Sequence, residues 1–243
     1  MLHYANIWEI NIKYCEQMLK ISVLVDNEPG RGLFGEWGLS IYAEYGKTKI
    51  LFDADTNPSV LDYNAGKLEI DLSKLDFAVL SHYHYDHTGG FKLVGEVAPS
   101  LTVYVPPGPG HELEELGLKP VVVEKTVEVF KGVYVIGPLE AWKDFYEIAL
   151  AIKLEGKGLV LLVGCSHPGV DKIALKAQKD TGNRVYHVIG GFHGPSKETL
   201  DKLAEIATYI SASHCSGNSA KNYLSRKYSE KYREVRTGTI IEY

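Results

Sequence analysis

The chain has 243 residues, of which 45% are hydrophobic and 23% charged, the balance of an ordinary soluble globular protein. It carries 31 acidic and 26 basic residues, a formal net charge of −5 without a basic tail, which argues against a large binding face for duplex nucleic acid. No apolar run approaches the roughly 18–20 residues of a membrane span. We therefore expect neither a nucleic-acid partner nor a membrane association, and the oligomeric state is left open.

The first seventeen residues differ from the rest of the chain. They show no clean period of 2 or 3.6, whereas a plain β-strand pattern follows Met18. We predict an N-terminal extension of uncertain status over residues 1–17 and a single domain over residues 18–243. Three cysteines, an odd number, follow no secretory signal, which favours a reducing, cytoplasmic location. Two glutamines and two methionines, against abundant Lys and Glu, lean towards a thermophile.

Strands and helices alternate along both halves of the chain. In the first half we expect strands at 20–26, 40–45, 49–52, 75–80 and 101–105, and helices at 59–66, just after 90 and at 112–116. In the second half we expect two or three strands within 121–136, a hairpin of 148–154 with 159–163, strands at 185–189, 209–213 and 239–241, and helices at 170–179, 197–208 and 220–228. This order predicts an α+β fold, a four-layer αββα sandwich of two mixed sheets with helices on the outer faces.

Four residues with metal-binding side chains follow the buried strand at 75–80. They are His82, His84, Asp86 and His87. In an extended segment His82 and His84 point the same way and can hold one ion, while Asp86 and His87, in the turn beyond, can serve a second. Imidazole and carboxylate are donors for zinc, iron or manganese. A set of incidental surface histidines is the alternative, and it fits this spacing poorly.

Three later histidines, His167, His193 and His214, stand in matching contexts. Each lies just beyond an apolar strand and beside small residues, where backbone and ion can approach closely. The repetition favours metal binding by His167 and His214. For His193 a ligand, a catalytic helper and a structural residue stay open.

The side chains near these histidines have simpler interpretations. Asp53 ends an apolar strand and can orient the metal-binding loop from behind the ligands, or else cap a helix. Cys165 and Cys215 flank the ligands; a thiolate ligand is possible, but packing behind the ligands is favoured. The remaining histidines are expected to be incidental, and they are His3, His111 and His187.

The motif His82-x-His84-x-Asp86-His87, with Asp53 at the end of an earlier strand, resembles the signature of the metallo-β-lactamase superfamily. The resemblance extends from about residue 20 to the C-terminus. It implies the same αββα sandwich and a site for two metals in a shallow groove at one edge. The segments 22–27, 37–40, 164–167, 190–193 and 214–217 resemble a subgroup, the archaeal dihydropterin ribofuranosylaminobenzene phosphate synthases.

The chain departs from the superfamily at two points. Members usually have a further histidine before the late hairpin, and an Asp that bridges both metals in a Gly-Asp pair after it. Here residues 138–146 contain no histidine, and Gly164 and Cys165 stand at the place of that pair. The resemblance therefore assigns His167 as the replacement ligand and His214 as the final one. The implied cofactor is two divalent ions, zinc or alternatively manganese or iron, and the missing Asp leaves the second site's geometry open.

The resemblance implies a metal-dependent hydrolase that uses a metal-activated water on a small phosphorylated or ester substrate. Asp86 would orient the nucleophile, and His193 would protonate the leaving group or hold a phosphate. Loops 27–38 and 106–117 are expected to set specificity.

Other functions stay open. The main alternative is a pterin-type transferase that condenses a dihydropterin methyl diphosphate with an aryl ribose phosphate. A nuclease is disfavoured by net acidity and only five arginines. A non-catalytic metal-binding sensor is favoured by the missing Asp, and redox use of an iron pair is a further alternative.

Overall fold

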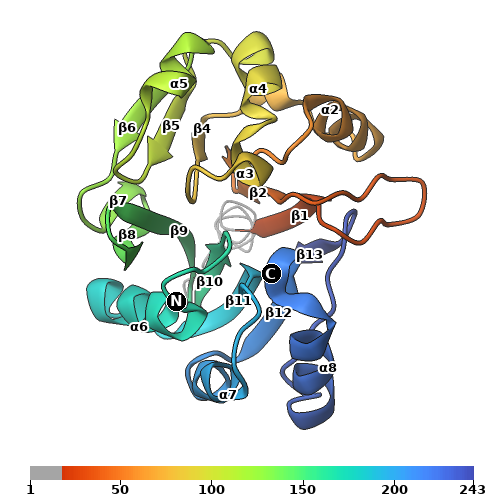
Figure 1. Cartoon of the computed structure of the whole chain (residues 1–243), viewed down its shortest axis with the longest axis vertical. Helices are drawn as coiled ribbons and strands as arrows, with labels where there is room; N and C mark the ends of the chain where they lie inside the picture. Colours follow the sequence, from red (N-terminus) through yellow and green to blue (C-terminus); the bar gives the residue numbers. More distant parts are fainter. Residues whose placement is uncertain (1–17) are drawn as a thin grey trace, which may run out of the picture.

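The computed structural model describes residues 18–243, and the expected extension over 1–17 lies outside it. Two mixed β-sheets form the centre of the described fold (Figure 1). The strands of the first sheet are β1 (Leu19–Val25), β2 (Ser40–Tyr45), β3 (Thr48–Phe52), β4 (Phe77–Val79), β5 (Thr102–Val105), β6 (Lys119–Val122) and β13 (Ile240–Glu242). Those of the second are β7 (Val127–Phe130), β8 (Val133–Trp142), β9 (Phe145–Leu154), β10 (Gly158–Val163), β11 (Val185–Gly191) and β12 (Tyr209–Ser213). Their spatial orders are β13-β1-β2-β3-β4-β5-β6 and β12-β11-β10-β9-β8-β7.

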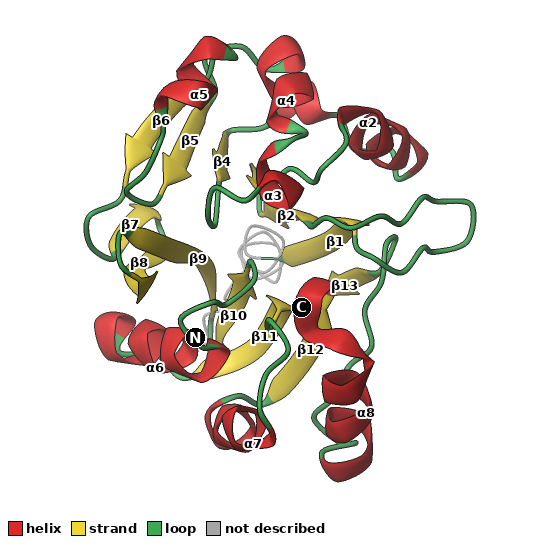
Figure 2. Cartoon of the chain, viewed as in Figure 1, coloured by secondary structure: helices red, strands yellow, loops and turns green. Residues whose placement is uncertain are grey.

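Helices cover the outer faces of both sheets (Figure 2). The helices of the described residues are α2 (Pro58–Lys67), α3 (Tyr85–Thr88), α4 (Phe91–Val97), α5 (His111–Glu115), α6 (Val170–Thr181), α7 (Lys197–Ile206) and α8 (Gly217–Lys227). Helices α2, α4 and α5 lie along the first sheet, and α6, α7 and α8 lie along the second. The predicted four-layer αββα sandwich is therefore confirmed.

Three apolar cores hold the four layers together, one between the sheets and one under each set of helices. Strand β10 shows why a continuous apolar run was needed. Its residues Leu159, Leu161 and Val163 face the helices, while Val160 and Leu162 face the other sheet. Because the strand is buried on both faces, alternation with polar residues is absent.

Strands β8 and β9 are longer than the sequence indicated, and they pair as a hairpin. The strands continue to Trp142 and Phe145, through a segment for which no element was predicted. The pairing register shifts between Ile136 and Leu139, and a bulge of this kind interrupts the alternation that marks a strand. The extension carries Phe145 and its neighbours to the edge where the candidate site lies.

The carboxyl ends of the parallel strands meet at one edge of the sandwich. β3 pairs with β4 in parallel, and β10, β11 and β12 are parallel neighbours in the other sheet. Asp53 follows β3 directly, and His214 follows β12 directly. Since ligand sites in such sheets form beyond the carboxyl ends of strands, this edge gathers the predicted site residues.

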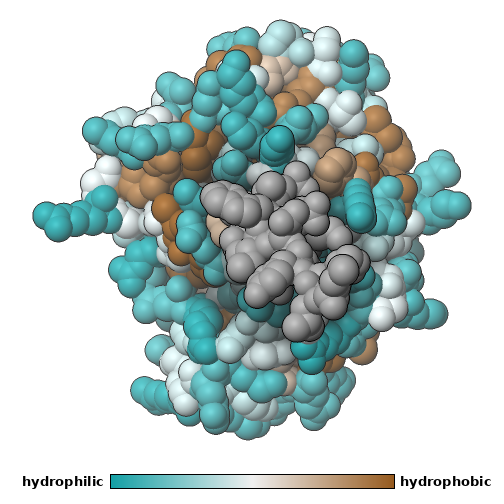
Figure 3. Space-filling model, turned by 180° about the vertical axis from the view of Figure 1, so that it is seen from behind, coloured by the Kyte–Doolittle hydropathy of each residue, from teal (hydrophilic) through white to brown (hydrophobic). Residues whose placement is uncertain are grey.

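The outer surface is mixed. Seen from behind, hydrophobic residues gather mainly in the upper half of the molecule, and the lower half is mostly hydrophilic (Figure 3). Within residues 18–243, no helix combines the length and the apolar character that crossing a membrane would require.

His187 is held inside the second sheet and close to β13. Its Nδ1 lies 2.6 Å from the Tyr243 hydroxyl, and its Nε2 lies 2.9 Å from the Ser211 hydroxyl. Burial, with a smaller contribution from the positive charge of Arg233, lowers the pKa of His187 to about 3. The ring is therefore neutral at pH 7, and its role is structural.

Acid should destabilise the fold through His187. The unfolded chain takes up a proton near pH 6.5, whereas folded His187 stays neutral down to about pH 3, so stability is lost as pH falls between these values. From pH 7 to pH 5 this group should remove about 2 kcal/mol from the free energy of unfolding. Urea denaturation at both pH values should show a smaller loss for His187→Gln. A control, His111→Gln on α5, should lose as much as the unchanged chain, and an equal loss in His187→Gln would contradict the assignment.

Candidate metal centre

Three imidazoles form one half of the site. His82 and His84 come from the loop after β4, and His167 comes from the loop after β10. His82 Nε2 lies 3.1 Å from His84 Nδ1, and the His167 ring centroid lies 4.8 and 4.9 Å from those of His82 and His84. The structure thus brings together the pair expected to share an ion and adds His167 to it.

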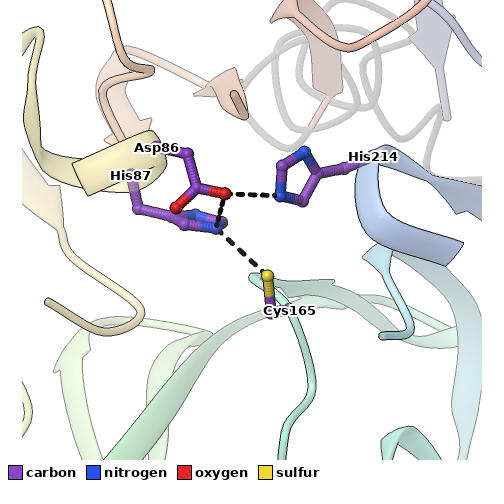
Figure 4. A group of neighbouring side chains, drawn as sticks. All are labelled: Asp86, His87, Cys165 and His214. Carbon is purple, nitrogen blue, oxygen red and sulfur yellow. Dashed lines mark hydrogen bonds and ion pairs between the residues drawn. The ribbon is translucent and has the colours of Figure 1, made fainter. Parts of the chain in front are cut away.

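A carboxylate, two imidazoles and a thiol form the other half (Figure 4). Asp86 Oδ2 lies 3.2 Å from His214 Nε2 and 3.7 Å from His87 Nε2, and Cys165 Sγ lies 3.3 Å from His87 Nε2. One ligand-type atom from each of these four residues lies within 4.8 Å of the others. The set joins two loops of the second sheet to α3.

Cys165 lies between the two halves. Its sulfur also groups with ligand-type atoms of His82 and His167 within 4.8 Å. Cys215 Sγ lies 3.3 Å from Cys165 Sγ, and both cysteines are free thiols. The sequence placed Cys165 behind the ligands, whereas here its sulfur faces the same space as theirs.

Asp53 holds the motif from behind. Its Oδ1 accepts a hydrogen bond from the Ser81 backbone N–H at 2.7 Å, and its Oδ2 accepts one from the Ser81 hydroxyl at 2.7 Å and lies 2.6 Å from His87 Nδ1. Helix α2 is capped by Asn57 instead, so Asp53 has no capping role there. Burial alone would lower the pKa of His87, but the Asp53 carboxylate outweighs it and raises that pKa to about 8. Asp53 thus turns His87 Nε2 towards Cys165.

Glu147 of β9 supports the other half and was not among the predicted site residues. Its carboxylate is fully buried; Oε1 accepts a hydrogen bond from the Ser166 backbone N–H at 2.7 Å. Oε2 accepts one from the His167 N–H at 2.8 Å and lies 3.1 Å from His167 Nδ1. An acidic residue that opens a buried strand was the available signal, but residue 147 lay just outside the predicted strand.

Asp26 and Asn27, after β1, hold His214. Asp26 Oδ1 accepts a hydrogen bond from the His214 backbone N–H at 2.5 Å. The Asn27 amide lies 3.0 Å from His214 Nδ1 through its oxygen and donates to the His214 carbonyl through its nitrogen. Both residues are polar and follow a strand, the same signal that identified the histidines, but neither was among the predicted site residues.

The electrostatics of the centre favour unprotonated nitrogen at His82 and His84. Burial, then the neighbouring imidazoles, lower the pKa of His82 well below its usual value, and burial and His167 lower that of His84. Burial alone would raise the pKa of Asp86, but His214 and His87 outweigh it and the pKa is lowered. Among the described residues, the buried His214 Nε2 has no partner in hydrogen-bonding geometry. Imidazole nitrogens, a carboxylate and a thiol that face one space are a donor set that fits divalent metal ions.

The mouth of the site is lined by His193 and by aromatic rings. His193 is exposed, its backbone N–H donates to Cys215 Sγ at 3.3 Å, and its ring centroid lies 4.4 Å from that of His167. Trp142 stacks on Phe145 at 4.2 Å with an interplanar angle of 7° and meets the His167 ring edge-on. His193 is thus within reach of a bound molecule without belonging to the buried set.

The sequence of the chain is similar to those of known proteins. A sequence model described as a beta-lactamase superfamily domain matches residues 48–145. The chain is 27% identical to the 7,8-dihydropterin-6-methyl-4-(beta-D-ribofuranosyl)-aminobenzene-5'-phosphate synthase of Methanocaldococcus jannaschii, over 93% of this chain and 97% of that protein.

Solved structures share the fold. Tm1679, described as a metal-dependent hydrolase of the beta-lactamase superfamily, matches with a TM-score of 0.77 at 24% identity, over 92% of this chain and 98% of that one. The metallo-beta-lactamase fold protein YhfI from Bacillus subtilis matches with a TM-score of 0.67 at 13% identity, over 93% and 100%.

Replacing Glu147 should loosen the grip on metal. In Glu147→Gln the side chain can no longer accept hydrogen bonds through two charged oxygens, so His167 loses its fixed orientation. We expect zinc affinity to fall by about 10–100-fold, measured by competition with a chromogenic chelator. Glu140→Gln, on the exposed part of β8, is the matched control and should bind zinc like the unchanged chain. Unaltered affinity in a folded Glu147→Gln variant would contradict this role.

Proposed function

We propose that this chain is a metal-dependent hydrolase of the metallo-β-lactamase superfamily that acts on a small phosphorylated or ester substrate. One observation carries the proposal. Side chains from separate loops converge on one space, and they are His82, His84, Asp86, His87, His167 and His214. With a net charge of −5, nucleic acid remains a disfavoured substrate.

Two groups of ligands support two divalent ions, zinc or alternatively manganese or iron. His82, His84 and His167 would hold one ion, and Asp86, His87 and His214 would hold the other. Bound ions would lower the pKa of a water towards ~7 and neutralise charge on a leaving oxygen.

We assign proton transfer and the orientation of the attacking water to two side chains. The Asp86 side chain is 17% exposed, whereas those of His87 and His214 are fully buried, so its carboxylate can meet both the ligands and the substrate. We assign Asp86 to orient the attacking water. His193, exposed beside His167, would protonate the leaving group or hold a phosphate.

A pterin-type transferase is the second candidate. It is favoured by the match to a curated synthase over nearly the full length of both chains. In such a condensation, the aryl ribose phosphate forms a bond to the pterin methyl carbon and loses a proton. The carbon–oxygen bond to diphosphate breaks in the same step. The same ligand set would face the departing diphosphate, so the geometry serves both reactions.

A direct assay separates the two candidates. The zinc- or manganese-loaded protein is offered phosphodiesters, phosphomonoesters and carboxylic esters, and separately a dihydropterin methyl diphosphate with and without the aryl ribose phosphate. Hydrolysis products support the first candidate, and a condensed product with free diphosphate supports the second.

Whichever reaction is found, His84→Ala should reduce turnover at least about 100-fold, because an ion loses a ligand. Glu155→Ala, exposed in the turn between β9 and β10 and away from the centre, is the control and should keep full activity. Retention of the fold is checked by circular dichroism. Undiminished activity in His84→Ala would overturn the proposal.

Cys165 is proposed as a ligand shared by the two halves, because its sulfur groups with both. The cobalt-loaded protein should therefore show thiolate-to-cobalt charge-transfer absorption in the near ultraviolet. Cys165→Ser should lose this absorption, and Cys215→Ser should retain it. Retention in Cys165→Ser would refute ligation by this thiol.

A further inference from the structure

A small cavity opens beside His214, between the loop 27–38 and the start of α8. It has a volume of about 210 Å³ and is lined by Asn27, Glu28, Trp37, His214, Cys215, Gly217, Asn218 and Lys221. We propose that this cavity binds a planar, uncharged heteroaromatic ring of the substrate, stacked on Trp37, with the reacting group over the metal centre. The proposal deepens the proposed function and rests on it for the position of the reacting group.

Trp37 forms the aromatic wall of the cavity. Its side chain is 62% exposed, and its ring centroid lies 5.2 Å from that of His214. The indole thus leaves most of its apolar surface to solvent at a point that adjoins the ligand set. A flat ring that covers this surface would gain apolar burial and stacking together.

The loop that carries Trp37 is held in place. The buried Asn64 side chain accepts a hydrogen bond from the Phe34 N–H at 3.0 Å and donates to the carbonyls of Phe34 and Leu24 at 2.8 and 2.9 Å. The Thr56 hydroxyl donates to the Trp37 carbonyl at 2.5 Å. Because the backbone is fixed before any molecule binds, ring binding pays little ordering entropy.

The charge of the cavity favours a neutral ring over a phosphate. Lys221 is the only cation among the lining residues, and its Nζ lies 2.7 Å from Glu28 Oε1. The pair leaves no net positive charge to hold an anion. The Glu28 carboxylate and the exposed Asn218 amide instead offer acceptors and a donor, which suit the amide-like edge of a pterin or purine.

The size of the cavity limits what it holds. Pockets for whole drug-sized ligands measure about 300–1,000 Å³, so 210 Å³ accommodates one ring system and not the complete substrate. The rest of the molecule must extend past His214 and Cys215, which lead to the metal centre. The ring therefore sets which substrate is accepted, while the centre acts on the group attached to it.

Calorimetric titration of the full chain with pterin tests the assignment, with and without zinc. We expect binding in both states, because the ring site does not require the ion. Trp37→Leu should weaken pterin binding at least about tenfold, the size of a lost stacking contact, and Trp37→Phe should restore most of the affinity. Phe130→Leu, an exposed aromatic ring on β7 and outside the site, is the control and should bind pterin normally.

Two further probes define the chemistry of the cavity. Quinoline, a flat bicycle without an amide-like edge, and inorganic phosphate should each bind at least about tenfold more weakly than pterin. Equal pterin affinity in Trp37→Leu, an equal loss in Phe130→Leu, or binding of pterin only to the zinc-loaded protein would overturn the ring site.

The outcomes are separable from those of the proposed function. Pterin binding that depends on Trp37, in a protein without turnover of any tested substrate, supports the ring site and contradicts the proposed activity. Turnover that Trp37→Leu leaves unchanged in both KM and pterin affinity does the reverse.

Discussion

Asp53 accepts hydrogen bonds from the backbone and the hydroxyl of Ser81 and lies 2.6 Å from the ring of His87, all at the carboxyl end of β3. The loop that carries the first histidines and the helix that carries His87 are thereby fixed to one buried carboxylate. Without this carboxylate, the loop and the helix would no longer be held by a common hydrogen-bond acceptor. His87 would also lose the orientation that turns its Nε2 inward. The rest of the centre is assembled around this arrangement.

The same device is repeated for two other histidines. Glu147 receives the backbone of the loop after β10 and lies against the ring of His167, and Asp26 receives the backbone N–H of His214. Glu147 comes from β9, the neighbour of β10, whereas Asp26 follows β1 of the first sheet and contacts the segment after β12 of the second. Buried carboxylates behind metal-binding imidazoles fix ring orientation and raise ligand basicity, so the support is part of the site's chemistry and not only of its stability.

A cysteine thiol lies at the centre of the site. Cys165 lies where both ligand groups meet, with Cys215 at 3.3 Å. Sulfur is a softer donor than a carboxylate, and soft donors shift preference towards ions such as zinc. The thiol pair and the cavity beside Trp37 are therefore features of the site that lie outside the histidine motif.

Much of this protein could be predicted from its sequence. The order of strands and helices, the four layers and the candidate residues His82, His84, Asp86 and His87 follow from local patterns, because apolar periodicity and closely spaced ligands need no knowledge of distant contacts. The strand-end contexts of His167 and His214 extend the same reasoning.

Tertiary structure alone decided how those segments meet. Glu147 is 20 residues from His167, and Asp26 is 188 residues from His214, so no local pattern links them. The position of Cys165 among the ligands depends on the pairing of β10 with β11 and on its meeting α3 across the two sheets. The cavity at Trp37 likewise depends on Asn64 of α2 holding a distant loop. Such contacts form because strands from both halves of the chain end at one edge. Sequence patterns can indicate that the strands end there, but they do not determine which side chains meet.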